Sequence, residues 1–211
     1  MYSGRYQSDG TSGLVTPENS TYLGYNTKSG SDSDGGEDAI DNEIVIGYNA
    51  IGNGSDTVTL GNTSIGELHC QVDITVDSDQ RIKKNITPVS TGLDFINALN
   101  PITFKRVNPA DYPNEIKPPE YKDRTITEKD NKGKAVEKIE LAEARPEDNN
   151  NIYLGLVAQE LEAIMTAQGL DFDIVSTSSN GKKAIRYGDL VIPLIKAVQE
   201  LNAKVNILEK R

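Results

Sequence analysis

A 14-residue internal repeat is the feature that most restricts how this 211-residue chain can fold. The stretch IVIGYNAIG at 44–52 aligns with VTLGNTSIG at 58–66, which matches Gly47 to Gly61, and YLGYNT at 22–27 is a degenerate earlier copy. Alternating β-branched residues followed by Gly or Asn turns predict short strands stacked as the rungs of a solenoid. Because so few rungs cannot stand alone, they must continue an upstream array or be completed by other chains.

The residues before the repeat are dominated by Gly, Ser, Asp, Asn and Thr, and this composition predicts a polar segment over 1–43 with no core of its own. Its acidic cluster does not have the spacing of a twelve-residue calcium loop and is interpreted as a solvated loop; it comprises Asp32, Asp34, Glu37 and Asp38. We therefore assign 1–77 to the end of a β-repeat stalk, with the repeats at 44–68.

The pattern changes after residue 77. Apolar residues at near-helical spacing in 93–99 predict a short helix, which Asn and Pro end, and a strand follows at 102–104. Residues 152–169 begin as a strand and become an amphipathic helix that the glycine at 169 closes. Mixed short helices and strands indicate an α+β domain over 78–211.

A charged segment at 108–151 interrupts this domain. Within it, RTITEKDNKGKAVEKIEL at 124–141 is strand-like on both sides of the turn signal KDNKGK, which predicts a long β-hairpin arm projecting from the body. A mobile surface insertion fits the composition equally well.

The C-terminal residues 187–211 carry a heptad seam with spacings of four and three, formed by Tyr187, Val191, Leu194, Val198, Leu201, Val205 and Leu208. This seam predicts a coiled-coil helix that assembles with other copies. Val at a with Leu at d favours two strands, whereas Ile195 and Ile207 widen the apolar face, so the side chains leave the order open. Pro193 must lie in the first helical turn or kink the helix.

Charge and composition argue against several partners. A net charge of -10 and a pI near 4.7 are unlike the basic surfaces that bind nucleic acid or anionic membranes, and no run of 18 apolar residues occurs. A single histidine, His69, in a strand-like segment and a single cysteine, Cys70, cannot supply a zinc site or an internal disulfide. We expect no metal, no cofactor and no catalytic role for His69.

The stretch VDSDQRIKKNITP at 76–88 places Ser78 five residues before Lys83. A serine before a polar turn is often only a cap, so the spacing by itself favours a turn. A lysine amine can nevertheless activate a serine when burial or nearby cations lower its pKa, and Arg81 and Lys84 supply positive charge. In an extended segment Ser78 would share a face with Lys84, whereas a turn or a second subunit would bring Lys83 to it.

Four blocks in order resemble a known family: SDQRIKKNI, GLDFINALNPITF, GLVAQELEAI and YGDLVIPLIKAVQELNAKVNILEKR. They are similar to the C-terminal intramolecular chaperone of phage endosialidases and other phage tail spikes and fibres, to which the self-cleaving domain of myelin regulatory factor is related. The resemblance covers 78–211. The repeats before it resemble the β-repeat stalks of phage fibres and trimeric adhesins.

The resemblance implies a homotrimer in which the chaperone domain brings three chains into register, guides folding of the upstream β-fibre of the same polypeptide, and cuts itself off with a Ser-Lys dyad. Carried over by position, the nucleophile is Ser78 and the base is Lys83, with Lys84 as the alternative base. The implied cut is Ser78–Asp79, although attack by Ser78 on its own preceding carbonyl would cut Asp77–Ser78. The released fragment would hold 133 residues, 79–211.

The expected architecture is therefore an elongated trimeric β-repeat stalk followed by an α+β chaperone domain with a hairpin arm and a C-terminal coiled coil. The resemblance places it in a virion tail fibre or spike after assembly in the host cytoplasm, with the arm gripping the fibre. The alternative is a non-cleaving trimerisation module of a surface adhesin or fibre, in which Ser78 is only a cap. The sequence contains no paired carboxylates and no catalytic triad that would support a hydrolase acting in trans.

Overall fold

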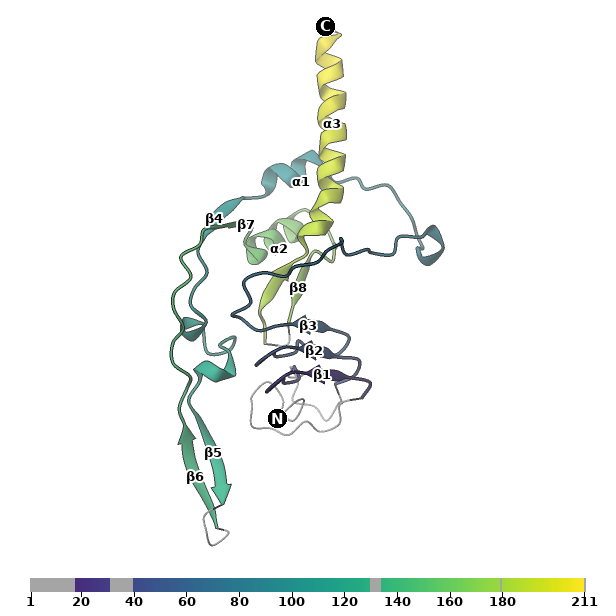
Figure 1. The fold of residues 1–211 in the computed structure, drawn as a ribbon. Coiled ribbons are helices and arrows are strands. Elements are labelled where there is room, and N and C mark those ends of the chain that lie inside the picture. The colour runs from purple at the N-terminus through teal and green to yellow at the C-terminus, as the bar shows by residue number, and fades with distance from the viewer. Residues whose placement is uncertain (1–17, 31–39, 130–133, 179, 211) are drawn as a thin grey trace. The chain divides into compact units, whose positions relative to one another are not determined.

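A computed structural model describes residues 18–30, 40–129, 134–178 and 180–210 (Figure 1). The acidic cluster considered above lies outside these residues. The chain divides into two compact units, of which the first contains 1–66, 105–152 and 177–182 and the second contains 67–104, 153–176 and 183–211. Three α-helices and several small sheets confirm that the fold mixes α and β structure.

The first unit contains a three-stranded parallel sheet made of β1 (Thr21–Leu23), β2 (Ile44–Ile46) and β3 (Val58–Leu60). Figure 1 shows the three strands stacked one above another. Ile44 pairs with Val58 at an offset of 14 residues, which is the period of the sequence repeat, and Thr21 pairs with Ile44 at an offset of 23. The first rung is therefore nine residues longer than the second.

Glycines in the repeat stand where the rungs turn. Gly24 and Gly47 have φ angles of +137° and +132°, values that residues with a side chain rarely adopt. A Cβ on Gly24 would lie 2.4 Å from the carbonyl oxygen of Gly47, in the rung above. Stacking at this corner thus requires glycine for both its backbone angle and its size.

The inside of the rungs contains polar side chains as well as apolar ones. Val45, Ser29 and Glu43 are completely buried, and Thr27 has an exposed fraction of 1%. This burial comes from the next rung, so the prediction that residues 1–43 make no core of their own stays a prediction. A rung gains its burial from the rung stacked on it, which composition counted over one segment cannot reveal.

Glu43 is the centre of a buried hydrogen-bond network. Its carboxylate accepts hydrogen bonds from the hydroxyls of Tyr22 at 2.9 Å and Ser29 at 2.8 Å, and from the backbone N–H groups of Gly30 at 3.1 Å and Gly54 at 3.0 Å. Burial, with a contribution from the nearby Glu43 charge, raises the pKa of Tyr22 to about 12. The Tyr22 phenol therefore stays protonated and continues to donate to the carboxylate at neutral pH.

The charged segment of the first unit contains the predicted hairpin, made of β5 (Arg124–Lys129) and β6 (Ala135–Glu140), and this prediction is confirmed. The strands pair antiparallel, with Thr125 opposite Ile139. Every residue of β6 is exposed, so the hairpin has no core of its own. Two 3-10 turns, η2 (Pro109–Asp111) and η3 (Pro119–Tyr121), precede it.

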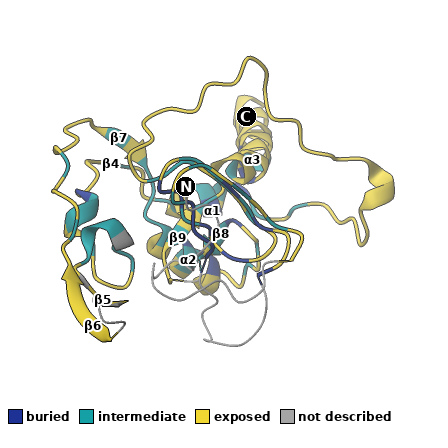
Figure 2. Ribbon diagram, turned by 60° about the horizontal axis from the view of Figure 1, so that its bottom comes forward, coloured by how far each residue is buried: buried dark blue, intermediate teal, exposed yellow. Residues whose placement is uncertain are grey.

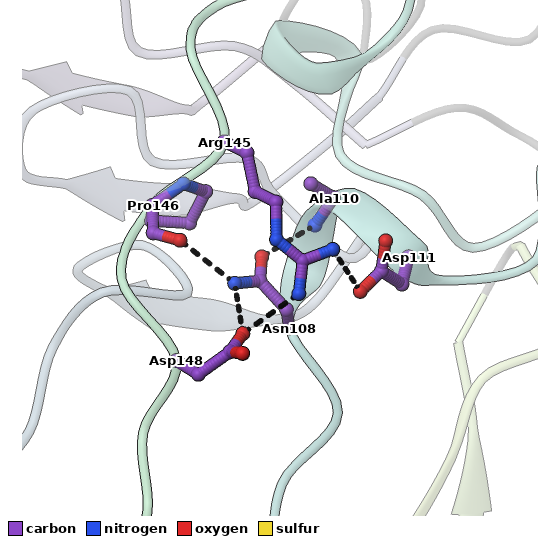
Figure 3. Close-up of polar contacts among 6 residues, drawn as sticks. All are labelled: Asn108, Ala110, Asp111, Arg145, Pro146 and Asp148. Carbon is purple, nitrogen blue, oxygen red and sulfur yellow. Dashed lines mark hydrogen bonds and ion pairs between the residues drawn. The ribbon is translucent and has the colours of Figure 1, made fainter.

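Polar contacts tie together the two ends of this segment (Figure 3). The buried Asn108 donates to the Pro146 carbonyl at 2.9 Å and to Asp148 at 2.8 Å. Arg145 pairs with Asp111 and, at 2.8 Å, with Asp148. The hydrogen bond from Asn108, followed by that from Arg145, holds the pKa of Asp148 below its ordinary value.

The second unit begins with η1 (Gln80–Ile82), α1 (Leu93–Ala98) and β4 (Ile102–Phe104). The predicted helix at 93–99 and strand at 102–104 are thus confirmed. Antiparallel pairing joins β4 to β7 (Tyr153–Gly155), and α2 (Ala158–Ala167) follows, with Gly169 in the left-handed conformation after it as predicted. The remaining two strands, β8 (Val175–Thr177) and β9 (Lys183–Ile185), pair with each other.

A small apolar core holds the second unit together. Phe95 of α1 is completely buried against Leu161 and Met165 of α2 and against Ile174. These four residues come from two helices and the segment before β8, so the core fixes α1 relative to α2 (Figure 2). Burial of an aromatic ring and three aliphatic side chains is the main apolar stabilisation of this unit.

The C-terminal helix α3 (Val191–Glu209) follows a 3-10 turn, η4 (Tyr187–Leu190). The α-helix thus begins four residues later than the predicted segment, and Pro193 lies in its first turn as expected. Pro193 and Ala197 are buried, and the Glu200 carboxylate accepts a hydrogen bond of 2.8 Å from the backbone of Leu93 at the start of α1.

The predicted heptad residues of η4 and α3 remain uncovered, with exposed fractions between 41% and 65%. The described chain therefore packs one face of α3 and leaves the seam free for another molecule. None of the helices in the described part of the chain is both long and apolar enough to cross a membrane.

Candidate functional site

The candidate site lies in a long exposed stretch between β3 and α1. Within residues 61–92, η1 is the only helix or strand among the described residues, and the chain bends at Gln71 and Val72. The strand expected around His69 is therefore not formed in the single chain. The physical reason is that an extended segment becomes a stable strand only when its backbone groups pair with a neighbour.

His69 and Cys70 take no part in a described site. The His69 ring contacts Glu67 at 2.8 Å, with both side chains more than three quarters exposed, and Cys70 is an exposed free thiol. In the described part of the chain, no group of three or more His, Cys, Asp or Glu residues is arranged to hold a metal ion.

A compact turn separates Ser78 from Lys83. Asp79 begins this turn by accepting a hydrogen bond of 2.8 Å from the Arg81 backbone N–H. The Arg81 guanidinium also binds the Asp79 carboxylate, with Nε at 3.0 Å and Nη2 at 2.7 Å. The turn closes where the Lys83 N–H donates to the carbonyl of Gln80 at 3.1 Å. The Arg81 side chain, and then its backbone N–H, keep the pKa of Asp79 below its ordinary value.

This turn brings the two predicted dyad residues together. The Lys83 amine lies 2.5 Å from the Ser78 hydroxyl oxygen and donates a hydrogen bond to it. An extended chain would place these residues on opposite faces, and the helical turn over Gln80–Ile82 removes that difference. The hydrogen bond to Ser78 is made by Lys83 rather than by the alternative base Lys84.

The arrangement has the parts of a nucleophile and its base. If the amine of Lys83 is neutral, the Ser78 hydroxyl can donate the hydrogen bond instead, and the amine can accept the hydroxyl proton. Both side chains are exposed in the described chain, so nothing shields this contact from water. The catalytic roles of Ser78 and Lys83 stay predictions, as does the position of the cut.

Sequence reasoning missed the part that Asp79 and Arg81 play in shaping the turn. Arg81 was considered only as a source of positive charge, and Asp79 only as the residue after the cut. An Asp followed two residues later by a donor is a common turn-forming pattern, so the signal was present in the sequence. The contacts make these two residues positioning elements for Lys83.

Residues 78–170 match a peptidase family whose model is described as the chaperone of endosialidase. Over these residues the chain is similar to an endosialidase-chaperone domain. The match begins at Ser78, the first residue of the proposed dyad, and runs through α1, β4, the charged segment, β7 and α2. It supports a chaperone role and, at the level of the family, peptidase activity. No curated protein matches the chain.

Proposed function

We propose that this chain is the end of a phage tail-fibre or tail-spike β-fibre joined to its intramolecular chaperone, which aligns three copies and then releases itself by one autoproteolytic cut beside Ser78. The observation that carries the proposal is the 2.5 Å contact between the Lys83 amine and the Ser78 hydroxyl at the first residue of the chaperone domain. The Lys83 amine takes the proton of Ser78, and the oxygen attacks a peptide carbonyl.

Ring size distinguishes the two candidate bonds. Attack by Ser78 on the carbonyl of Asp77 closes a five-membered ring, moves the acyl group from nitrogen to oxygen, and after hydrolysis cuts Asp77–Ser78. Attack by the same hydroxyl on its own carbonyl would close a four-membered ring. The favoured cut at Ser78–Asp79 therefore uses the hydroxyl of another copy or a water molecule activated by the dyad. In every case one water is consumed, and one carboxylate and one amine are formed.

Association of three copies supplies what the single chain lacks. The heptad seam of α3 is exposed along its whole length, and its a and d positions are those through which helices pair. Intertwined β-fibres fold slowly because their contacts join distant parts of several chains, and a local helical trimer lowers the cost of bringing those chains together. Removal of the chaperone afterwards prevents the fibre from unfolding by the same route, which gives kinetic stability.

The test is a denaturing gel of the purified chain and its variants. The wild type should give two bands, one of them at the size of 133 residues, whereas Ser78→Ala and Lys83→Ala should each give a single full-length band. Lys84→Ala is the matched control, because it removes an adjacent lysine that does not bind Ser78, and it should cleave as the wild type does. The intact mass of the small fragment locates the bond. Cleavage that persists in Ser78→Ala would disprove the dyad.

The alternative is a trimerisation module that does not cleave. The exposure of both Ser78 and Lys83 in the single chain favours it. A wild-type chain that assembles into trimers, shown by light scattering, and still runs as one full-length band would establish this second function.

The segment at 108–151 is proposed to grip the fibre in the assembled protein. The contacts of Asp148 with Asn108 and Arg145 hold the two ends of the segment together, and every residue of β6 is exposed. Both features suit an arm that extends outward. Deleting the segment should lower trimer yield, and an unchanged yield and fibre stability would rule this role out.

A further inference from the structure

The Lys83 amine contacts the Ser78 hydroxyl and makes no ion pair with a carboxylate among the described residues. This is notable because two acids, Asp77 and Asp79, stand on either side of Ser78 in the chain. A lysine can act as a base only in its neutral form, whereas an ion pair with a carboxylate favours the charged form. Whatever occupies these acids therefore affects whether Lys83 can take a proton.

Arg81 occupies the whole carboxylate of Asp79. The Oδ1 atom accepts hydrogen bonds from the Arg81 backbone N–H at 2.8 Å and from Nε at 3.0 Å. The Oδ2 atom accepts from Nη2 at 2.7 Å and from Nε at 3.2 Å. Because a carboxylate offers about four acceptor sites, these four contacts leave none for a second cation. The hydrogen bond to Asp79 also raises the pKa of Arg81, so the guanidinium stays charged.

The charges that face Lys83 come from its own stretch of the chain. Every residue from 63 to 88 is exposed, so no other helix or strand in the described part of the chain covers the amine. The charged neighbours of Lys83 within 76–88 are Asp77, Asp79, Arg81 and Lys84. Of these neighbours, only Asp79 and Arg81 are joined by a described ion pair.

We propose that Arg81 is a positioning residue that acts through Asp79: by occupying the Asp79 carboxylate, it keeps this acid from pairing with Lys83 and leaves the amine free to serve Ser78. Without Arg81, the bare carboxylate next to Ser78 would attract the lysine ammonium and stabilise its charged form. The pKa of Lys83 would rise, and a higher pH would be needed before the amine could accept the Ser78 proton. The part of this inference that concerns cleavage rests on the proposed function.

The pH dependence of cleavage tests the inference, because a residue that only shapes the turn would change the rate and not its pH midpoint. Full-length chains with a photocaged serine at position 78 stay whole through purification, and light then starts cleavage at a chosen pH. The rate of fragment formation is measured on denaturing gels across a series of pH values. Circular dichroism checks that each variant is folded.

Arg81→Gln should raise the pH midpoint by about one unit, at the lower end of the effect of a nearby opposite charge because the pair is exposed. Asp79→Asn should not raise it, and Asp79→Asn/Arg81→Gln should restore the wild-type midpoint because no bare carboxylate remains. The matched control is Lys84→Gln, which also removes one positive charge but frees no acid, and should cause a smaller rise. In about 1 M salt, where charges are screened beyond about 3 Å, the effect of Arg81→Gln should shrink.

An Arg81→Gln midpoint that equals the wild-type value, or that Asp79→Asn fails to restore, would overturn the inference. So would a rate that falls by the same factor at every pH.

A second readout does not depend on cleavage. In the Ser78→Ala chain, the pKa of Lys83 measured by NMR should be higher with Arg81→Gln than with Asp79→Asn/Arg81→Gln. If Ser78→Ala still cleaves, the proposed function fails and this NMR comparison alone decides the effect of Arg81. If the dyad is required but the two Lys83 pKa values are equal, the dyad stands and this inference fails.

Discussion

Replacing Glu43 by alanine should loosen the stacked rungs β1–β3 more than any substitution of an exposed acid. The wild-type carboxylate satisfies four donors, of which the Ser29 hydroxyl and two backbone N–H groups are buried and the Tyr22 hydroxyl is half-buried. Each buried donor left without a partner costs about 1–3 kcal/mol. If water enters the space of the carboxylate and satisfies two of the four, the loss is about 4 kcal/mol. Glu43→Gln keeps one acceptor oxygen and a similar volume, and should cost about 1–2 kcal/mol.

The measurement is urea unfolding followed by circular dichroism, together with hydrogen exchange of peptides from the rungs, all in the uncleaved Ser78→Ala chain. Glu18→Ala is the matched control, because this acid is exposed in the first rung and no hydrogen bond of its side chain is described. It should change the free energy of unfolding by no more than about 0.5 kcal/mol. If Glu43→Ala is as mild as Glu18→Ala, the carboxylate does not hold the rungs together.

Three further predictions concern the stacked rungs, the apolar core of the second unit and the contacts that join the two ends of the segment at 108–151. The folded chain retains the Tyr22 proton that the unfolded chain releases, so the free energy of unfolding should fall as the pH rises from 10.0 to about 12. Tyr22→Phe should be less stable than the wild type at neutral pH, but its free energy of unfolding, measured by urea titration, should fall less over that interval. Phe95→Ala empties a completely buried site and should cost about 3–5 kcal/mol, measured by the same unfolding, and a loss under about 1 kcal/mol would contradict the described packing. The pKa of Asp148 is held below 3.8, so its hydrogen bonds with Asn108 and Arg145 are intact above pH 3.8 and should be lost as the pH falls below it. The side-chain amide resonance of Asn108 should shift in this acidic range in the wild type and should be insensitive to pH in Asp148→Asn.

The local elements could be predicted because their signals lie in neighbouring residues. The helix at Leu93–Ala98, the strand at Ile102–Phe104, the hairpin and the glycine after α2 each follow from spacing or turn chemistry within a few residues. The parallel pairing of β2 with β3 at an offset of 14 agrees with the period read from the repeat. The seam of α3 was also visible, although the sequence did not show that its first four residues form a 3-10 turn.

The candidate site was predicted in its residues but not in its shape. Ser78, Lys83 and Lys84 could be named from the sequence, yet counting positions along an extended chain favoured Lys84. The contact with Lys83 depends on Asp79 and Arg81, which fold the intervening residues into a turn. Side-chain contacts of this kind decide between adjacent lysines because one residue of turn changes the direction of every side chain after it.

The sequence by itself determined the period of the repeat, the types of the short elements, the apolar seam and the two residues of the proposed dyad, since these are written in local spacing. Only the tertiary structure decided which side chains meet. It buried Glu43 among donors from two rungs, and it placed Lys83 against Ser78. It also left the apolar side chains of Leu68, Val72, Ile74 and Val76 exposed. Burial and pairing depend on residues distant in the chain, or on other copies of it, and a local pattern carries no record of which partner will be there.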